Sequence, residues 1–409
     1  MNLSESSMHK AEQTINEKPY SFMNSSNLLS GYDIKKLTIG ALGGHSALDV
    51  CHGAKKLGFN TVVVAQEGRE KTYDNYFKTR ARSRSQIGCV DSVIKVPKFN
   101  NVLDEAVQKQ LRGLNTIFIH NRYFWTYVDN FAAVENDFHV PIFGSRSLLK
   151  LEERDGSARL TTGQPYNQYH LLADAGIRTP KIFKNAAEID RLCIVKASEA
   201  KRGYERAFFL ASSKQGWETE GSHLEKEGAV NADWRSATIE EFIVGAPVNF
   251  NFFYSPLTGE LELLGTDTRR QTNLDGFLRM TADQQHVAAK HVPLKMIETG
   301  HIACTIKESL VEKAFAMGEQ FVKATQRSKC DPTGRGIIGP FALQGAVTAE
   351  EGREDIVIFD VSLRIPGSPG TRSTPYSGYL YGEPLSVGER VAMEIRQAVA
   401  EKALEKIIT

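Results

Sequence analysis

Between residues 36 and 150, short apolar runs alternate with amphipathic segments. KLTIGAL (36–42) and TVVVAQ (61–66) are typical of buried strands, and HSALDVCHGAKKLG (45–58) between them predicts a helix. Further apolar runs lie at 92–96, 116–120 and 141–144, with helical patterns at 101–113 and 124–136. Strands separated by helices predict a parallel sheet with right-handed crossovers.

Ligands of such sheets bind beyond the carboxyl ends of the strands. GGHS (43–46) follows the first strand and His120 ends a later one, so both lie where a ligand is expected. The glycine pattern is not GxGxxG, which makes a dinucleotide site a weak interpretation. Taken singly, His45 and His120 are more often structural than functional.

The pattern changes after about residue 180. RLCIVKAS (191–198) and RAFFLAS (206–212) predict two strands joined by a charged turn with one glycine, at 199–205. Three strand-like runs then follow in series at 238–245, 248–257 and 260–267, which predicts a meander. Helical spacing returns at 308–326 and 387–407.

The composition is that of an ordinary globular enzyme, with 409 residues, 41% hydrophobic and 24% charged. A net charge of +1 gives no sign of a nucleic-acid surface, and no apolar run approaches the roughly 18 residues that span a bilayer. The five scattered cysteines favour a reducing, cytoplasmic compartment. Residues 1–33 are rich in Ser, Asn, Glu and Lys, so we expect a flexible extension there, with room for one short helix.

The last third of the chain contains two strand-like segments with oxygen-bearing side chains. IIGPFALQGAV (337–347) carries Gln344, and DIVIFDVSLRIPG (355–367) carries Asp360, Ser362 and Arg364 at alternating positions, which share one face of a strand. The intervening TAEEGRE predicts a hairpin that brings Gln344 towards Asp360. Such oxygens beside an arginine suit Mg²⁺ and a triphosphate. The alternative is an amphipathic sheet with a solvated polar face.

Other residues are candidates for ligand binding because of the strand or loop in which they lie. Lys196 lies in an apolar strand, where it contacts nucleotide phosphates or extends to solvent at a strand edge. Glu240 and Glu241 face opposite sides of a strand before a linker between two sheets, so one of them is a candidate for binding ribose or adenine. The polar stretch at 266–276 offers Arg269, Arg270 and Asn273 as candidates for binding phosphate or carboxylate, the alternative being a long polar loop.

These pieces, in this order, resemble the ATP-grasp superfamily. More specifically, the chain is similar from about residue 36 to 409 to the formate-dependent 5-formaminoimidazole-4-carboxamide ribonucleotide (FAICAR) synthetases of archaeal purine biosynthesis. The similarity is carried by LGGHSALDVCHGAKKLGFNTV, PIFGSR, LLADAGIRTPK, IEEFIVG, FFYSPLTGELELLG, NLDG, IKESL, IGPFALQ and YLYGEPLSVGERVAMEI. No motif of a covalent hydrolase or a zinc enzyme, such as GxSxG or HExxH, occurs in the sequence.

The resemblance implies an α/β and α+β fold, with a Rossmann-like parallel-sheet domain before a two-subdomain ATP-grasp fold. We place the first domain at 34–150, the first ATP-grasp subdomain with a lid-like insertion at 151–245, and the second, with the metal site, at 246–409. The implied reaction joins formate to the 5-amino group of aminoimidazole carboxamide ribonucleotide (AICAR) through formyl phosphate, with ATP and Mg²⁺ or Mn²⁺ as cofactors. A homo-oligomer is also implied.

The resemblance also implies roles for single residues. His45, Ser46, Arg122 and His301 are expected at the substrate, and Lys196, Glu240, Glu241 and Gln271 at the nucleotide. Gln344 and Asp360 are expected at the metal, and Arg364 is the expected catalytic arginine.

Several positions depart from the family pattern. His301 stands for an asparagine, and Gln271 and Asp360 each stand for a glutamate. Asn121 and Arg122 replace a Gly-Ser pair. The turn at 199–205 has one glycine where the family has several, and IPGSPGTRS (365–373) replaces a DGGTN-like stretch. These changes leave two alternatives open. One is a paralogous ligase with another carboxylate and amine, and the other is a non-catalytic nucleotide-binding homologue.

Overall fold

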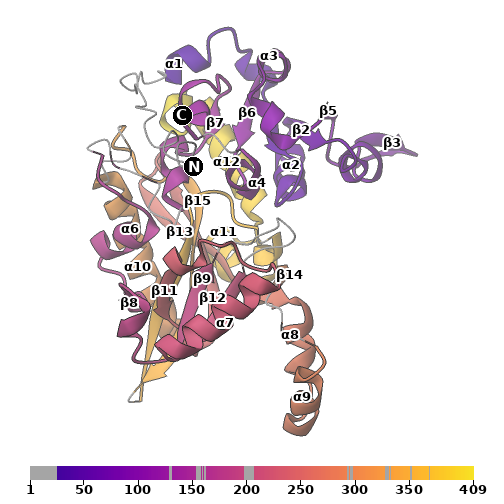
Figure 1. Cartoon of the computed structure of the whole chain (residues 1–409). Helices are drawn as coiled ribbons and strands as arrows, with labels where there is room; N and C mark the ends of the chain where they lie inside the picture. Colours follow the sequence, from indigo (N-terminus) through magenta and orange to yellow (C-terminus); the bar gives the residue numbers. More distant parts are fainter. Residues whose placement is uncertain are drawn as a thin grey trace, which may run out of the picture.

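The computed structural model (Figure 1) describes residues 25–128, 131–152, 158, 160, 163–197, 207–292, 294, 298–327, 331, 333–350, 352–367 and 369–409. The turn at 199–205 and half of the insertion at 154–167 lie outside these residues. The described strands form three main sheets and one small hairpin. Among the helices of the described residues, none combines the length and apolar character that a membrane span requires.

The first sheet is parallel, as the alternating pattern predicts. Its order is β5 (Ser92–Val96), β2 (Asn60–Gln66), β1 (Thr38–Leu42), β6 (Thr116–Ile119) and β7 (Ile142–Phe143). The helices of this region are α2 (Ala47–Lys56), α3 (Glu105–Gly113), α4 (Arg122–Tyr127) and α5 (Phe131–Asn136), so the helical pattern at 124–136 corresponds to two short helices. The order reverses between β1 and β6, which makes their carboxyl ends a topological switch point.

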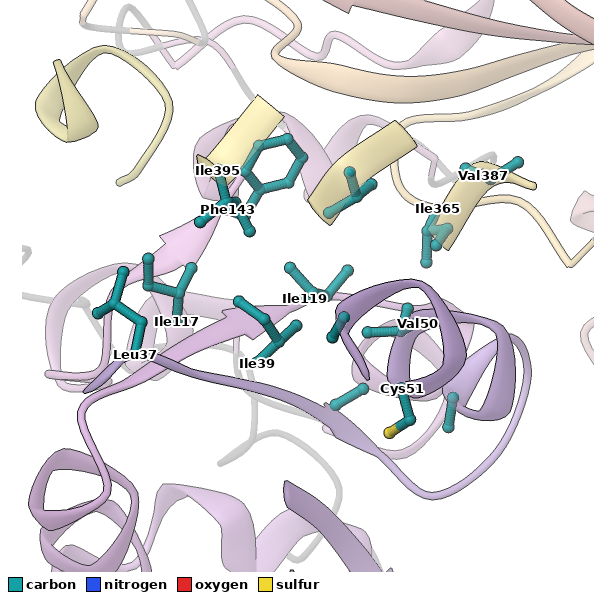
Figure 2. Packing of buried hydrophobic residues seen from close by; sticks show 14 of the residues in the cluster. Leu37, Ile39, Val50, Cys51, Ile117, Ile119, Phe143, Ile365, Val387 and Ile395 are labelled. Atoms are coloured by element: carbon teal, nitrogen blue, oxygen red, sulfur yellow. The ribbon is translucent and has the colours of Figure 1, made fainter. Parts of the chain in front are cut away.

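The end of the chain returns to this first sheet. The closing helix α12 (Val387–Ala400) packs against α2, and its Val387 and Ile395 lie in one apolar cluster with Ile39 and Ile119 (Figure 2). A β-bridge between Phe143 and Ile408 joins the last residues to β7.

The N-terminal segment also packs on the first sheet. Residues 25–33, which fall within the expected flexible extension, include the helix α1 (Ser25–Leu28). Tyr32 donates a hydrogen bond to the Thr116 carbonyl at 3.0 Å, and Leu28 is buried. Residues 25–33 therefore pack on the first sheet, with the short helix α1 inside the expected extension.

The second sheet is antiparallel and follows the order β10 (Ala207–Ala211), β9 (Cys193–Ala197), β11 (Thr238–Glu241) and β8 (Ile182–Phe183). The predicted pairing of the two strands around 191–212 is confirmed, with Lys196 opposite Phe208. Trp217 from α7 (Lys214–Lys226) and Trp234 fill the core beneath this sheet. The helix α6 (Gln168–Asp174) precedes it.

The third sheet has the order β14 (Glu298–Cys304), β13 (Glu260–Gln271), β12 (Ala246–Ser255), β15 (Gly339–Glu350) and β16 (Arg353–Ser362). The predicted hairpin is confirmed, because Gln344 pairs with Asp360. The predicted meander is wrong at its first strand. The run beginning at Thr238 forms β11 of the second sheet, because its backbone pairs with β8 and β9, and the meander continues instead through β12, β13 and β14.

The helix α10 (Glu308–Arg327) packs on this third sheet and on α6. Two parts extend from the body in Figure 1, namely the hairpin of β3 (Arg80–Arg82) and β4 (Ser85–Ile87), and the arm of α8 (Thr272–Phe277) and α9 (Ala282–Ala289). The short helix α11 (Tyr376–Tyr381) precedes α12.

Candidate active site

The switch point of the first sheet holds the expected substrate residues. His45 and Ser46 follow β1, and Arg122 begins α4 just beyond β6. Asn121 ties the two ends together, because its Nδ2 donates to the Leu42 carbonyl at 2.9 Å while its Oδ1 caps α4. Ser46 has a φ of 70°, and its hydroxyl donates to the Pro366 carbonyl at 2.7 Å. The loop after β16 is thereby held over the end of β1.

The His45 ring lies between this loop and the third sheet. A Cβ on Gly367 would fall 1.2 Å from its Cε1, so the ring packs on the glycine backbone. Its Nε2 is 3.7 Å from Glu298 Oε1, and its centroid is 6.5 Å from that of His301. Burial, with the positive charges of Arg364 and Arg122, lowers the pKa of His45 to about 3. The imidazole is therefore neutral at physiological pH.

A row of polar side chains crosses the third sheet. Its backbone register pairs His301 with Arg269, Asp267 with Asn249, Asn249 with Gln344, and Gln344 with Asp360. Directly opposed residues on neighbouring strands share a face, so these side chains form one surface. Asn249, Asp267, Gln344 and Asp360 are all buried, which is costly unless polar partners or a ligand satisfy them.

One end of the row is a carboxylate–imidazole cluster. His301 Nδ1 lies 2.5 Å from Asp267 Oδ1, and its Nε2 lies 2.8 Å from Glu298 Oε1. Burial alone lowers the pKa of His301, but the two carboxylates outweigh it and raise the value to about 9. For Glu298, burial favours a higher pKa, but the His301 hydrogen bond and Arg269 lower it to about 2. The pair is therefore an imidazolium beside a carboxylate.

The other end contains the expected metal residues. Arg269 donates to the Gln344 amide oxygen, and Gln344 Nε2 donates to the Ser362 hydroxyl at 3.0 Å. Within the described ranges, no group of three or more His, Cys, Asp or Glu is placed to hold a metal ion. The paired oxygens of Gln344 and Asp360 nevertheless fit Mg²⁺, which needs only one or two protein ligands beside waters and phosphate oxygens.

Lys196 connects the second sheet to this row. Its ammonium lies 2.6 Å from Glu240 Oε1 and donates to the Tyr169 hydroxyl at 3.3 Å and to the Phe359 carbonyl at 3.1 Å. Phe359 directly precedes Asp360, so the lysine reaches the strand that carries the expected metal ligand. Glu241 faces the other side of β11, where Arg191 Nη1 lies 3.1 Å from its carboxylate.

Arg364 lies just beyond the end of β16. Its Nη2 is 3.5 Å from Glu152 Oε2, while Glu152 Oε1 accepts the Leu363 N–H at 2.6 Å. Burial lowers the pKa of Arg364 and raises that of Glu152, and each opposes the shift of the other. His120 is buried nearby, and burial lowers its pKa to about 3.

The structure thus brings most of the sequence-predicted residues into one connected region. Gln271 lies at the end of β13, where its backbone pairs with Glu298 of β14 and its backbone N–H donates to Asp275 at 3.1 Å. Sequence reasoning missed five members of the cluster, namely Glu152, Asn249, Asn251, Asp267 and Glu298. For the two asparagines a signal existed, since they alternate with apolar residues in VNFNFF.

Comparison with known proteins identifies the family. Residues 39–183 match a model described as "Protein of unknown function (DUF1246)", and residues 217–409 match "Domain of unknown function (DUF1297)". A "5-formaminoimidazole-4-carboxamide-1-(beta)-D-ribofuranosyl 5'-monophosphate synthetase" from Methanopyrus kandleri is 34% identical over 93% of this chain and 98% of the relative. The synthetase of that name from Methanocaldococcus jannaschii is 37% identical over 92% and 96%. The chain belongs to this FAICAR synthetase family.

Solved structures place the family member in the ATP-grasp fold. An IMP biosynthesis protein PurP from Thermococcus kodakaraensis superposes with a TM-score of 0.62 at 24% identity, covering 91% of this chain and 100% of PurP. The ADP complex of PurK, an N5-carboxyaminoimidazole ribonucleotide synthetase, superposes with a TM-score of 0.53 at 13% identity, covering 86% and 78%. The expected ATP-grasp architecture is thereby confirmed.

Proposed function

We propose that this FAICAR synthetase family member is an ATP-dependent ligase that joins formate to the 5-amino group of AICAR ribonucleotide, giving FAICAR, ADP and phosphate. The observation that carries the proposal is the contact of Lys196 with β16 beside Asp360. It joins the expected nucleotide lysine to the polar row, and the row reaches His45 at the switch point. Family membership over nearly the whole chain supports the same reaction.

On the nucleotide side, we assign Lys196 to the phosphates, with Glu240 holding its ammonium in place. Glu241 is assigned to the ribose or adenine, and Gln271 remains a proposed nucleotide contact. Gln344 and Asp360 would hold Mg²⁺ or Mn²⁺, which offsets phosphate charge when bound. Arg269 donates to the Gln344 oxygen, so this guanidinium also lies where a phosphate or carboxylate oxygen would be received.

On the acceptor side, we assign His45, Ser46, Arg122 and His301 to the substrate pocket. Because His45 is neutral, its imidazole can donate or accept a hydrogen bond without adding charge. Arg122 lowers the pKa of both His45 and Glu298, which supports its place beside the pocket. Arg364 is assigned to the charge that develops during phosphoryl and formyl transfer, because its guanidinium is fixed by Glu152 and buried.

We also propose a homo-oligomer in the cytoplasm, with small-molecule substrates as its ligands. The arm of α8 and α9 exposes large apolar side chains, with Leu278 at 70% and Val287 at 61% exposure. Self-association would cover such a surface. The cysteines within the described residues are free thiols, in keeping with a reducing compartment.

A second candidate is a ligase of the same fold for another small carboxylate and amine. It is favoured by the charged His301–Glu298 pair, because the resemblance to the family implies a neutral asparagine at position 301. A changed charge pattern beside the acceptor alters which substrates complement it.

The test is ADP release by the purified protein with ATP, Mg²⁺ and formate, with and without AICAR, together with mass analysis of the product. AICAR-dependent ADP release and a product heavier by one formyl group are expected. Lys196→Met should abolish turnover, whereas Lys181→Met, which removes an exposed lysine paired with Asp190, should leave it unchanged. ADP release that does not depend on AICAR would refute the default substrate and favour the second candidate.

A further inference from the structure

Glu298 occupies a junction between the acceptor pocket and the polar row. Its Oε1 is 2.8 Å from His301 Nε2 and 3.7 Å from His45 Nε2, and its Oε2 is 3.2 Å from Arg269 Nε. A carboxylate has about four lone-pair sites, so these contacts leave acceptor capacity on Glu298. The side chain is 14% exposed, which keeps it within reach of a small molecule.

His301 lies between two carboxylates. Both of its ring nitrogens contact carboxylates, and Asp267 is in turn held by Asn249 Nδ2 at 2.7 Å and Asn251 Nδ2 at 2.6 Å. The asparagines fix Asp267, Asp267 fixes the histidine, and the histidine fixes Glu298. Such a chain places the Glu298 carboxylate with little freedom.

We propose that Glu298 receives an N–H of the amine-bearing substrate, and that His301 is the positioning residue that holds this carboxylate towards His45. The inference rests on the proposed function and assigns one of its substrate contacts. The chemistry of the neighbours supports an amine, because a carboxylate that is already ionised accepts hydrogen bonds and repels formate and phosphate. Arg122, Arg269 and Arg364 are the groups suited to those anions.

The charges around His301 define a pH dependence. Asp267 and Arg269 face it from β13, Glu298 from its own strand, and His45 from the loop after β1. Arg122 acts on His45 and Glu298, and Arg364 acts on His45. The raised pKa of about 9 means that the imidazolium persists at neutral pH and is lost as pH rises through that value. Glu298 then loses its charged partner and its fixed orientation.

The experiment compares Glu298→Gln and His301→Asn in the full-length protein, with KM for AICAR, KM for ATP and kcat measured between pH 7 and 10. Loss of one charge-assisted hydrogen bond predicts a rise of about 10- to 100-fold in KM for AICAR in Glu298→Gln, with KM for ATP unchanged. Wild-type KM for AICAR should rise above about pH 9, whereas His301→Asn should show a raised and flat profile.

Matched controls are His223→Asn and Glu227→Gln. His223 lies on α7 and Glu227 just beyond its end, and the two exposed side chains are 3.4 Å apart. Neither substitution should change kcat or the KM for AICAR or ATP. An unchanged KM for AICAR in Glu298→Gln, with normal wild-type turnover, overturns this inference alone. A His301→Asn profile that still rises above pH 9 overturns the positioning role. No turnover of AICAR by the wild type overturns the proposed function, and this inference with it.

Discussion

Arg390 joins the third sheet to α12 through a buried charge cluster. Its Nε donates to the two oxygens of Glu262 at 3.1 and 2.8 Å, its Nη2 donates to Glu262 at 2.7 Å, and its Nη1 donates to Glu394 at 2.9 Å. None of the three side chains is more than 5% exposed. The guanidinium also lies over the Phe253 ring, 4.1 Å from its centroid.

Arg390→Met removes the cation while keeping an extended apolar side chain. Glu394 keeps the hydrogen bond from Ser255 at 2.7 Å, but two buried carboxylates lose their shared counter-charge. Removal of one partner from a buried ion pair costs about 3–5 kcal/mol, and two carboxylates place the expected loss near 5 kcal/mol at pH 8. That is a large fraction of the roughly 5–15 kcal/mol that stabilises a folded protein.

The loss of folding stability in Arg390→Met should depend on pH. Burial already raises the pKa of Glu394 against the opposing effect of Arg390, and without the arginine this carboxyl group has a folded-state pKa further above its unfolded value. Such groups stabilise the fold most below the unfolded pKa, and their contribution is lost as pH rises through the folded pKa. The variant should therefore be less destabilised at pH 5.5 than at pH 8.

The assay is urea unfolding followed by far-UV circular dichroism at both pH values. The control is Arg235→Met, because Arg235 also bridges two carboxylates, Glu218 at 2.7 Å and Glu225 at 3.0 Å, but on the surface. Solvent screens the Arg235 cluster, so Arg235→Met should lower the free energy of unfolding far less than Arg390→Met does. Equal losses in the two variants, or a loss in Arg390→Met that is the same at pH 5.5 and pH 8, would refute the reasoning.

Two glycine substitutions test close backbone contacts. Gly367→Ala should displace His45 and raise KM for AICAR about tenfold, which corresponds to the loss of one polar contact. Gly370→Ala places its Cβ in open space, so KM for AICAR should stay unchanged in this control. Steady-state kinetics measures both values. Gly53→Ala places a Cβ 2.3 Å from the backbone of α12 and should cost about 1–3 kcal/mol, since neither backbone can yield easily. Gly113→Ala, with nothing within 4 Å, should be neutral or stabilising, and an unchanged melting temperature in Gly53→Ala would contradict the close helix contact.

Local patterns predicted the elements whose partners lie close in the chain. The alternating strands and helices of the first sheet, the hairpin that pairs Gln344 with Asp360, and the pairing of β9 with β10 all follow from periodicity and turn signals. The linker after Glu241 does separate two sheets, as its position before FIVG indicated. Each of these inferences needed only short-range information.

Partners distant in the chain were not predictable in this way. The amphipathic pattern of α12 shows that one face is buried, but not that it packs on α2, more than 300 residues earlier. Likewise, TIEEFIVG has strand character, but its partners β8 and β9 are set by tertiary contacts rather than by the next strand along the chain. Propensity fixes the kind of element, and the packing of the whole chain selects its neighbours.

Because side-chain partners are set by tertiary packing, the sequence indicated His301 as a candidate site residue but not Glu298. A histidine in a family position of asparagine attracts attention, but its role depends on the groups that reach its two nitrogens, and these come from β13 and from its own strand. An imidazolium at this position requires carboxylates on both sides, because an unpaired buried charge is costly. His301, Asp267 and Glu298 therefore act as one unit, and a change of substrate preference in this chain would have to involve all three.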